Sequence, residues 1–179
     1  MKRALLIFLL LVPLVVLLAQ HQHGSGPATQ TSKSAEAAHH AFLDQERQAI
    51  ERGEGFGMSM PADKAGYPGP KHVLELKSEL KLTPEQVAGM EKLFADMKTK
   101  AIERGREVLA AEQRLEQMFR EGRSVDELRE ESFRIASLRA ELRWVHLGTH
   151  LAARKLLTAQ QIATYLQLRY PPAGHSHNP

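Results

Sequence analysis

The chain has 179 residues, which is enough for one domain with appendages at its ends. It contains no cysteine, and this excludes disulfides, thiolate metal sites, thiol nucleophiles and a lipoprotein anchor. The formal charge of +3 does not indicate a nucleic-acid binder, because residues 84–154 hold 13 Lys or Arg against 13 Asp or Glu and have no basic excess.

Residues 1–19 have the pattern of an export signal. Lys2 and Arg3 precede an uncharged, largely apolar run from Ala4 to Ala19. That run is short for a membrane span, which needs about 20 residues. We therefore expect residues 1–19 to be a signal peptide, with a retained N-terminal inner-membrane anchor as the alternative. Either way, the remainder of the chain is predicted to be periplasmic.

Residues 20–71 are predicted to form a flexible linker followed by a Gly/Pro-rich loop. Residues 20–35 consist mainly of Gly, Ser, Thr, Gln, Pro and His, with almost no apolar side chain. A thin apolar stripe favours a short helix at 36–52. Five glycines and three prolines in 53–70 predict an irregular loop there.

A helical domain is predicted over residues 72–170. Its first element is a short helix at 72–80, and a long helix follows over 84–121. Thr83 is suited to cap this long helix, because Gln86 lies three positions later and can close a capping box. A helix of this length would span about 57 Å.

Further signals predict where the long helix bends and where the next two begin. Gly105 is expected to bend the long helix, and Gly122 to end it in the left-handed conformation. Two more capping boxes, Ser124 with Glu127 and Thr158 with Gln161, predict the starts of helices that end near positions 156 and 169. Prolines stop the last helix, and 171–179 is predicted to be a disordered tail.

The predicted fold class is all-α, with a long antiparallel helical hairpin and short terminal helices. The short turn near Gly122 makes the two long helices antiparallel neighbours. A hairpin of this kind is too thin to bury its apolar stripe alone. We therefore expect an intertwined homodimer packed through the long helices.

Two histidines in the returning helix are candidate metal ligands. His146 and His150 are four positions apart, so both imidazoles would project from one helix face and could reach a single ion. Neutral imidazole binds Zn²⁺, Ni²⁺, Co²⁺ or Cu²⁺. The alternative interpretation is that both flank the core and form hydrogen bonds with nearby carboxylates.

The pair of LTxxQ motifs at Leu82–Gln86 and Leu157–Gln161, in an exported, cysteine-free, all-helical chain, resembles the Spy and CpxP-like periplasmic family. Segments YPGPKHVLEL at 67–76 and HLGTHLAARKLLTAQQ at 146–161 are most similar to its heavy-metal sensor and zinc-resistance-associated branch. The resemblance implies a helical hairpin that dimerises, senses or buffers divalent metal outside the cytoplasm, and holds unfolded proteins.

The resemblance also implies metal ligands at His72, His146 and His150. The chain departs from the branch at Leu76, where a second histidine four positions after His72 would be expected. The position of His72 at a helix start after Pro70 suits an exposed residue near the cap equally well. Five other side chains are possible additional ligands, but solvated charges or core residues are the favoured interpretation: Glu75, Glu79, Glu91, Met90 and Met97.

No nucleophile elbow, phosphate loop or HExxH motif is present, so we expect a non-enzyme. The favoured function is extracytoplasmic heavy-metal sensing or resistance, with a divalent transition metal bound by histidines. The alternative is a periplasmic ATP-independent chaperone or envelope-stress adaptor, and a third is a structural dimer without ligand. Expected partners are a second copy, a membrane signalling protein or unfolded clients. Nucleic acid is not expected, and membrane contact only if the N-terminal segment is retained.

Overall fold

The computed structural model describes residues 27–171. The predicted leader at 1–19, residues 20–26 of the predicted linker and residues 172–179 of the predicted tail lie outside the described residues. The chain divides into two units, Met1–Ala38 and His39–Pro179. Every contact discussed below lies within the second unit.

The described part of the chain contains helices and no strands, which confirms the all-α prediction. The six helices of residues 27–171 are α1 (Pro27–Glu51), α2 (Met60–Lys64), α3 (Pro70–Glu75), α4 (Pro84–Arg120), α5 (Val125–Lys155) and α6 (Ala159–Arg169). Among these, no helix combines the length and the apolar character that a membrane crossing needs.

Helix also occupies segments that were predicted to be irregular. Helix α1 begins at Pro27, inside the predicted linker, and α2 lies inside the predicted Gly/Pro-rich loop. Proline explains both starts, because its missing N–H and fixed φ are compatible with the first helical turn. Conversely, α3 stops at Glu75 instead of position 80, and turns lead to Lys81, which has a φ of +50°.

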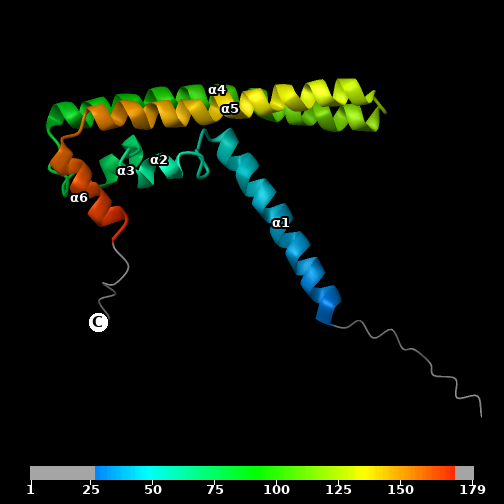
Figure 1. Cartoon of the computed structure of the whole chain (residues 1–179), viewed down its shortest axis with the longest axis horizontal. Coiled ribbons are helices and arrows are strands. Elements are labelled where there is room, and N and C mark those ends of the chain that lie inside the picture. The colour runs from blue at the N-terminus through cyan, green and yellow to red at the C-terminus, as the bar shows by residue number, and fades with distance from the viewer. Residues whose placement is uncertain (1–26, 172–179) are drawn as a thin grey trace, which may run out of the picture. The chain divides into compact units, whose positions relative to one another are not determined.

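Helices α4 and α5, of 37 and 31 residues, form a long pair that lies side by side (Figure 1). Gly122, in the short turn between them, has a φ of +65°, as expected for a residue that ends a helix. All three predicted capping boxes are present. The apolar faces enclose one core cluster of Ile50, Ala101, Val108, Ala111, Ile135, Leu138 and Leu142.

Gly105 lies where the end of α1 packs directly on α4. A Cβ atom built on Gly105 would be 2.8 Å from both Cγ2 and the carbonyl oxygen of Ile50. The α4 helix continues through Gly105 to Arg120, and the missing side chain of this glycine permits the close approach of Ile50. Ile50 is 1% exposed and has no room to move away.

We predict that Gly105→Ala lowers the free energy of unfolding by about 1–3 kcal/mol, because the clash outweighs the better helix propensity of alanine. Gly148→Ala is the matched control, since Gly148 is also helical but a Cβ there meets nothing within 4 Å. It should stabilise the chain by up to about 1 kcal/mol. Urea unfolding of both variants measures the difference, and two stabilised variants would contradict the packing role.

The two LTxxQ motifs are joined by their glutamine side chains. Gln86 and Gln161 each donate from Nε2 to the other's Oε1 over 2.9 Å. Each glutamine also reaches a carbonyl beside the other motif, Gln86 that of Leu156 at 2.7 Å and Gln161 that of Leu80 at 3.2 Å. This glutamine pair therefore ties the start of α4 to the start of α6 while each side chain closes its own capping box.

A second core cluster lies beside the glutamine pair and packs α3, α4, α5 and α6 together. Its buried members are Val73, Leu80, Met90, Ala153 and Tyr165. Because residues from four helices share this cluster, α3 and α6 are held against the same end of the long pair. Their side chains can then border one cleft with those of α5.

We predict that Gln86→Ala and Gln161→Ala each lower the free energy of unfolding by about 1–3 kcal/mol, because each leaves polar groups of both motifs without hydrogen-bond partners. The double variant should cost less than the sum by about 1 kcal/mol, since either single substitution already breaks the pair. Urea unfolding of the wild type, the two single variants and the double variant measures this coupling. Gln113→Ala, exposed within α4, is the control and should be neutral. Additive costs would contradict a direct coupling between the motifs.

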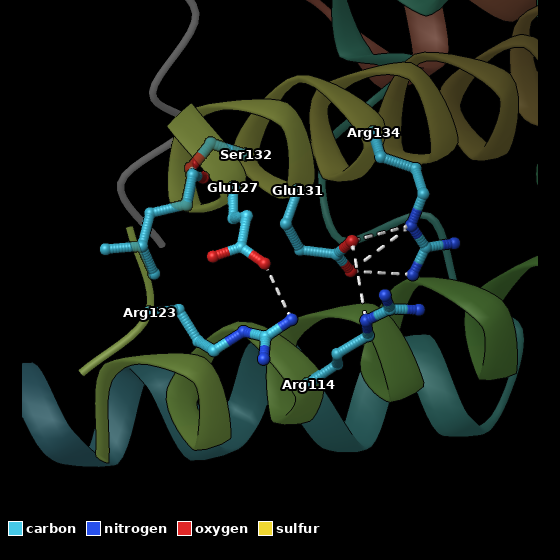
Figure 2. Close-up of polar contacts among 7 residues, drawn as sticks. Arg114, Arg123, Glu127, Glu131, Ser132 and Arg134 are labelled. Carbon is cyan, nitrogen blue, oxygen red and sulfur yellow. Dashed lines mark hydrogen bonds and ion pairs between the residues drawn. The ribbon is translucent and has the colours of Figure 1, made fainter. Parts of the chain in front are cut away.

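Charged residues hold the turn end of the long pair (Figure 2). The Glu131 side chain is 6% exposed, and its carboxylate accepts from Arg134 of the same helix at 2.7 Å and faces Arg114 of α4 at 3.8 Å. The Arg134 hydrogen bond outweighs desolvation and lowers the pKa of Glu131. The nearby Arg123–Glu127 pair is 2.6 Å apart. One of these pairs, Arg114–Glu131, crosses between the two long helices, and it adds to the apolar packing of Met118, which is 8% exposed near the turn.

Candidate functional site

All three predicted histidines line a single cleft of about 490 Å³. His72 comes from α3, and His146 and His150 come from α5. The walls are completed by the segment that follows α1, by part of α4 and by the end of α6. The other lining residues are Arg52, Gly53, Glu54, Gly55, Phe56, Gly57, Ser59, Met60, Asp63, Gly69, Pro70, Lys71, Phe94, Met97, Lys98, Arg169 and Tyr170. Segments that are distant in sequence therefore share one site.

His146 is buried with an unsatisfied ring nitrogen. It is 3% exposed, and its Nε2 atom has no hydrogen-bond partner. The other ring nitrogen lies against Gly55, where a Cβ atom would be 3.2 Å from Nδ1. Burial, with a smaller effect of the neighbouring His150, lowers the pKa of His146. The imidazole is therefore neutral at neutral pH, the form in which histidine binds metals.

His150, one turn later, is held in a defined orientation. Its Nδ1 lies 2.6 Å from the carbonyl oxygen of Tyr67, and a carbonyl can only accept, so Nδ1 carries the hydrogen. This leaves the lone pair on Nε2. A Cβ atom on Gly69 would be 2.8 Å from Nε2, so the His150 ring can occupy this position only because residue 69 is glycine. Backbone support of one ring nitrogen is typical of metal-binding histidines.

His72 is half-buried in the first turn of α3. Its Nδ1 is buried and has no hydrogen-bond partner. The nearest carboxylate oxygen, Oδ2 of Asp63, is 3.9 Å away, which is too long for a hydrogen bond and allows an ion pair only when His72 is protonated. The cleft thus contains two buried imidazole nitrogens without partners, one on His72 and one on His146.

Asp63 is the central residue that sequence reasoning missed. It is 3% exposed, and its Oδ1 accepts from the Tyr165 hydroxyl at 2.7 Å and from the Gly69 amide at 3.2 Å. Its Oδ2 accepts from the Tyr170 hydroxyl. Asp63 is the only acidic residue between Glu54 and Glu75, and this isolation in the sequence is the feature that could have identified it.

The environment of Asp63 favours its ionised form. Desolvation alone would raise the pKa of its carboxyl, but His72, the hydroxyls of Tyr170 and Tyr165, and the Gly69 amide together lower it. In return, burial and the carboxylate raise the pKa of Tyr170 to about 12. The ionised carboxylate thereby fixes α2, the start of α3 and α6 around the cleft.

We predict that Asp63→Asn lowers the free energy of unfolding by about 1.5–3 kcal/mol at neutral pH, because charge-assisted bonds to the hydroxyls are lost. A lowered folded-state pKa contributes stability that is fully present above the unfolded Asp value of about 3.9 and is lost as pH falls below it. The gap between wild type and Asp63→Asn should therefore shrink from about pH 5 downward. Urea unfolding across pH measures it, and a constant gap would contradict an ionised Asp63.

The three histidines share the cleft without forming a completed coordination shell. Within residues 27–171, no group of three or more His, Cys, Asp or Glu side chains is placed to hold a metal ion. Of the further donors considered from sequence, the Met97 thioether lines the cleft, whereas Met90 belongs to the core cluster of α3–α6. The three glutamates considered with them, Glu75, Glu79 and Glu91, do not line it.

The cleft offers donor types that transition metals accept. The nitrogens of His72 and His146 are buried without hydrogen-bond partners, and the two α5 imidazoles pack closely against glycines, His146 against Gly55 and His150 against Gly69. Imidazole nitrogens with a nearby thioether match borderline-soft divalent ions better than Mg²⁺ or Ca²⁺. Lys71 and Lys98 also line the cleft and are exposed, whereas His146 and His150 are buried.

In comparisons with known proteins, no family model, no curated protein and no solved structure matches this chain.

Proposed function

We propose that this chain is an extracytoplasmic heavy-metal sensing or resistance protein that binds a divalent transition metal through His72, His146 and His150. The proposal includes export to the periplasm by the N-terminal segment. It also includes a helical hairpin of the Spy and CpxP type, which the two LTxxQ motifs support. A membrane signalling protein is the partner that a sensing role would require.

One observation carries the proposal. His72 and the α5 pair are far apart in sequence, yet they line the same cleft, and two of the three imidazoles have a buried nitrogen without a partner. A buried polar atom without a hydrogen bond is costly, and folded proteins rarely keep one without a reason. A bound ion would satisfy these nitrogens and recover that cost.

The protein residues would act by holding neutral imidazoles in place. Burial keeps His146 neutral, and the Tyr67 carbonyl orients His150 so that Nε2 carries its lone pair. The metal, when bound, would link α3 to α5. Binding at this junction would favour one arrangement of α3 and α6 on the long pair, which is what a sensor needs in order to transmit occupancy.

We predict that the purified protein binds Zn²⁺ with one ion per chain, measured by isothermal titration calorimetry at neutral pH. Replacing His146 and His150 together with alanine should weaken binding at least about 100-fold, because two imidazole ligands are lost. His72→Ala should weaken it by about tenfold or more. Circular dichroism of each variant verifies that the helices remain.

His39→Ala with His40→Ala is the matched control, because this histidine pair is exposed on α1 and lies outside the cleft. Its affinity should equal that of the wild type. Unchanged Zn²⁺ affinity after loss of both α5 histidines would contradict the proposed site. The same titration with Ni²⁺, Co²⁺ and Cu²⁺ then identifies the preferred ion.

A chaperone or stress-adaptor function is the second candidate because of exposed apolar side chains near the turn of the long pair. Phe119 is 64% exposed and Val125 is 81% exposed. Such residues can bind unfolded clients. Suppression of the aggregation of an unfolded client, with and without Zn²⁺, separates the two functions. Strong suppression that is independent of the histidines would favour the chaperone and count against the sensor.

A further inference from the structure

Arg154 continues the helix face that carries the two α5 histidines. It lies four positions after His150, which lies four positions after His146, so the three side chains follow one another at about one turn each. The half-buried side chain of Arg154 donates from Nη1 to the carbonyl oxygen of Gly66. Its Cζ atom lies 4.6 Å from the centroid of the Tyr67 ring, within the range of a cation–π contact. One side chain of α5 thus holds both residues of the turn that follows α2.

The backbone that Arg154 holds is also the backbone that orients His150. The Nδ1–H of His150 donates to the carbonyl of Tyr67 over 2.6 Å, and Arg154 donates to the preceding carbonyl, that of Gly66. Two consecutive peptide carbonyls therefore accept from two α5 side chains that lie one turn apart. A Cβ atom built on Gly66 would be 3.2 Å from Nη1 of Arg154, so the guanidinium packs directly on this backbone.

The hydrogen bonds inside this turn fix its shape and leave its carbonyls for α5. Gly66 has a φ of +81°, and its amide donates to the carbonyl of Asp63 at 3.1 Å. The Tyr67 amide donates to the carbonyl of Ala62 at 3.0 Å, which completes the glycine-containing pattern that ends many helices. Both amides are thus used within the turn, whereas both carbonyls accept from α5. These two carbonyl contacts are the polar link between the turn and the helix.

The place of the Tyr67 carbonyl decides which nitrogen of His150 carries a lone pair. A neutral imidazole has one N–H, and the hydrogen bond made by one ring nitrogen determines where that hydrogen lies. With the carbonyl as acceptor, the hydrogen is on Nδ1 and the lone pair is on Nε2. A shift of the turn away from α5 would remove this acceptor. The ring could then rotate and carry its hydrogen on Nε2, which is not a ligand in that form.

We propose that Arg154 is a positioning residue of the metal site. It holds Gly66 and Tyr67 against α5, and the Tyr67 carbonyl in turn keeps the hydrogen of His150 on Nδ1 and presents Nε2 as the ligand. Arg154 acts through His150, because a guanidinium has no lone pair to offer an ion. This role rests on the proposed function in one respect, namely that Nε2 of His150 binds the metal. The link from Arg154 to the His150 ring exists in the metal-free protein.

The first test is the tautomer of His150 in the full, metal-free chain. It is measured by ¹⁵N NMR of the imidazole rings at about pH 8, above the ordinary histidine pKa of about 6.5. In the wild type the hydrogen of His150 should lie on Nδ1. Arg154→Gln should shift a large part of the population to the Nε2–H form, because the Tyr67 carbonyl is no longer held in place. The His146 ring, which packs on Gly55 instead, should keep its spectrum.

The second test is Zn²⁺ affinity, measured by isothermal titration calorimetry. Arg154→Gln should weaken binding by about tenfold, the effect expected when a group that orients a metal ligand is lost. Arg154→Lys keeps the charge and a donor but not the planar fork, so it should lie between the wild type and Arg154→Gln in both tests. Circular dichroism verifies that the helices of each variant remain.

Arg129→Gln is the matched control for both tests. Arg129 also lies over an aromatic ring on α5, 5.4 Å from the centroid of Phe133, but it is about six turns before His150. Its replacement should change neither the His150 tautomer nor the Zn²⁺ affinity. Effects equal to those of Arg154→Gln would contradict a specific role of Arg154.

Failure of this role and failure of the proposed function give different results. An unchanged His150 tautomer in Arg154→Gln would overturn the positioning role, whatever happens to Zn²⁺ affinity. A shifted tautomer with unchanged affinity would overturn it as well, because the orientation of His150 would then not matter to binding. A wild type that binds no Zn²⁺ would overturn the proposed function, and the tautomer spectra would still decide whether Arg154 orients His150.

Discussion

The reciprocal hydrogen bonds between Gln86 and Gln161 are the interaction on which the site depends. Each amide closes a helix start and, with its remaining hydrogen-bonding capacity, reaches the other motif. Two local caps thereby become one tertiary link that holds α6 against the start of α4. The core cluster around Tyr165 then fixes α3 at the same end, and the cleft with its three histidines forms between these elements and α5.

The cleft contains two kinds of buried polar group. Asp63 is buried but receives hydrogen bonds from two tyrosines and a backbone amide, so its charge is compensated within the protein. The imidazoles of His72 and His146 each retain a buried nitrogen without a hydrogen-bond partner. The carboxylate therefore has a structural role in holding the walls together. The ring nitrogens of the two histidines, in contrast, are polar atoms that the described chain leaves without hydrogen bonds.

Several features of this site were predictable from residue patterns, and others were not. Capping boxes are local, so the starts of α4, α5 and α6 followed from closely spaced residues. Gly105 was interpreted as a bend because a glycine inside a helix weakens it, but its contact is with Ile50 of α1, a distant part of the sequence. Asp63 was overlooked because its partners, Tyr165 and Tyr170, lie at the far end of the described chain, in and just after α6.

The sequence by itself determined the all-helical class and the main helix starts, because apolar periodicity and caps act over short distances along the chain. It also placed His146 and His150 on one helix face, since their spacing is about one turn. Only the tertiary structure decided that His72 lines the same cleft, that the two α5 imidazoles pack against the glycines at 55 and 69, and that α5 has large apolar side chains exposed on its outer face. Each of these depends on which distant segments pack together, and contacts of that kind leave no periodic trace in the sequence.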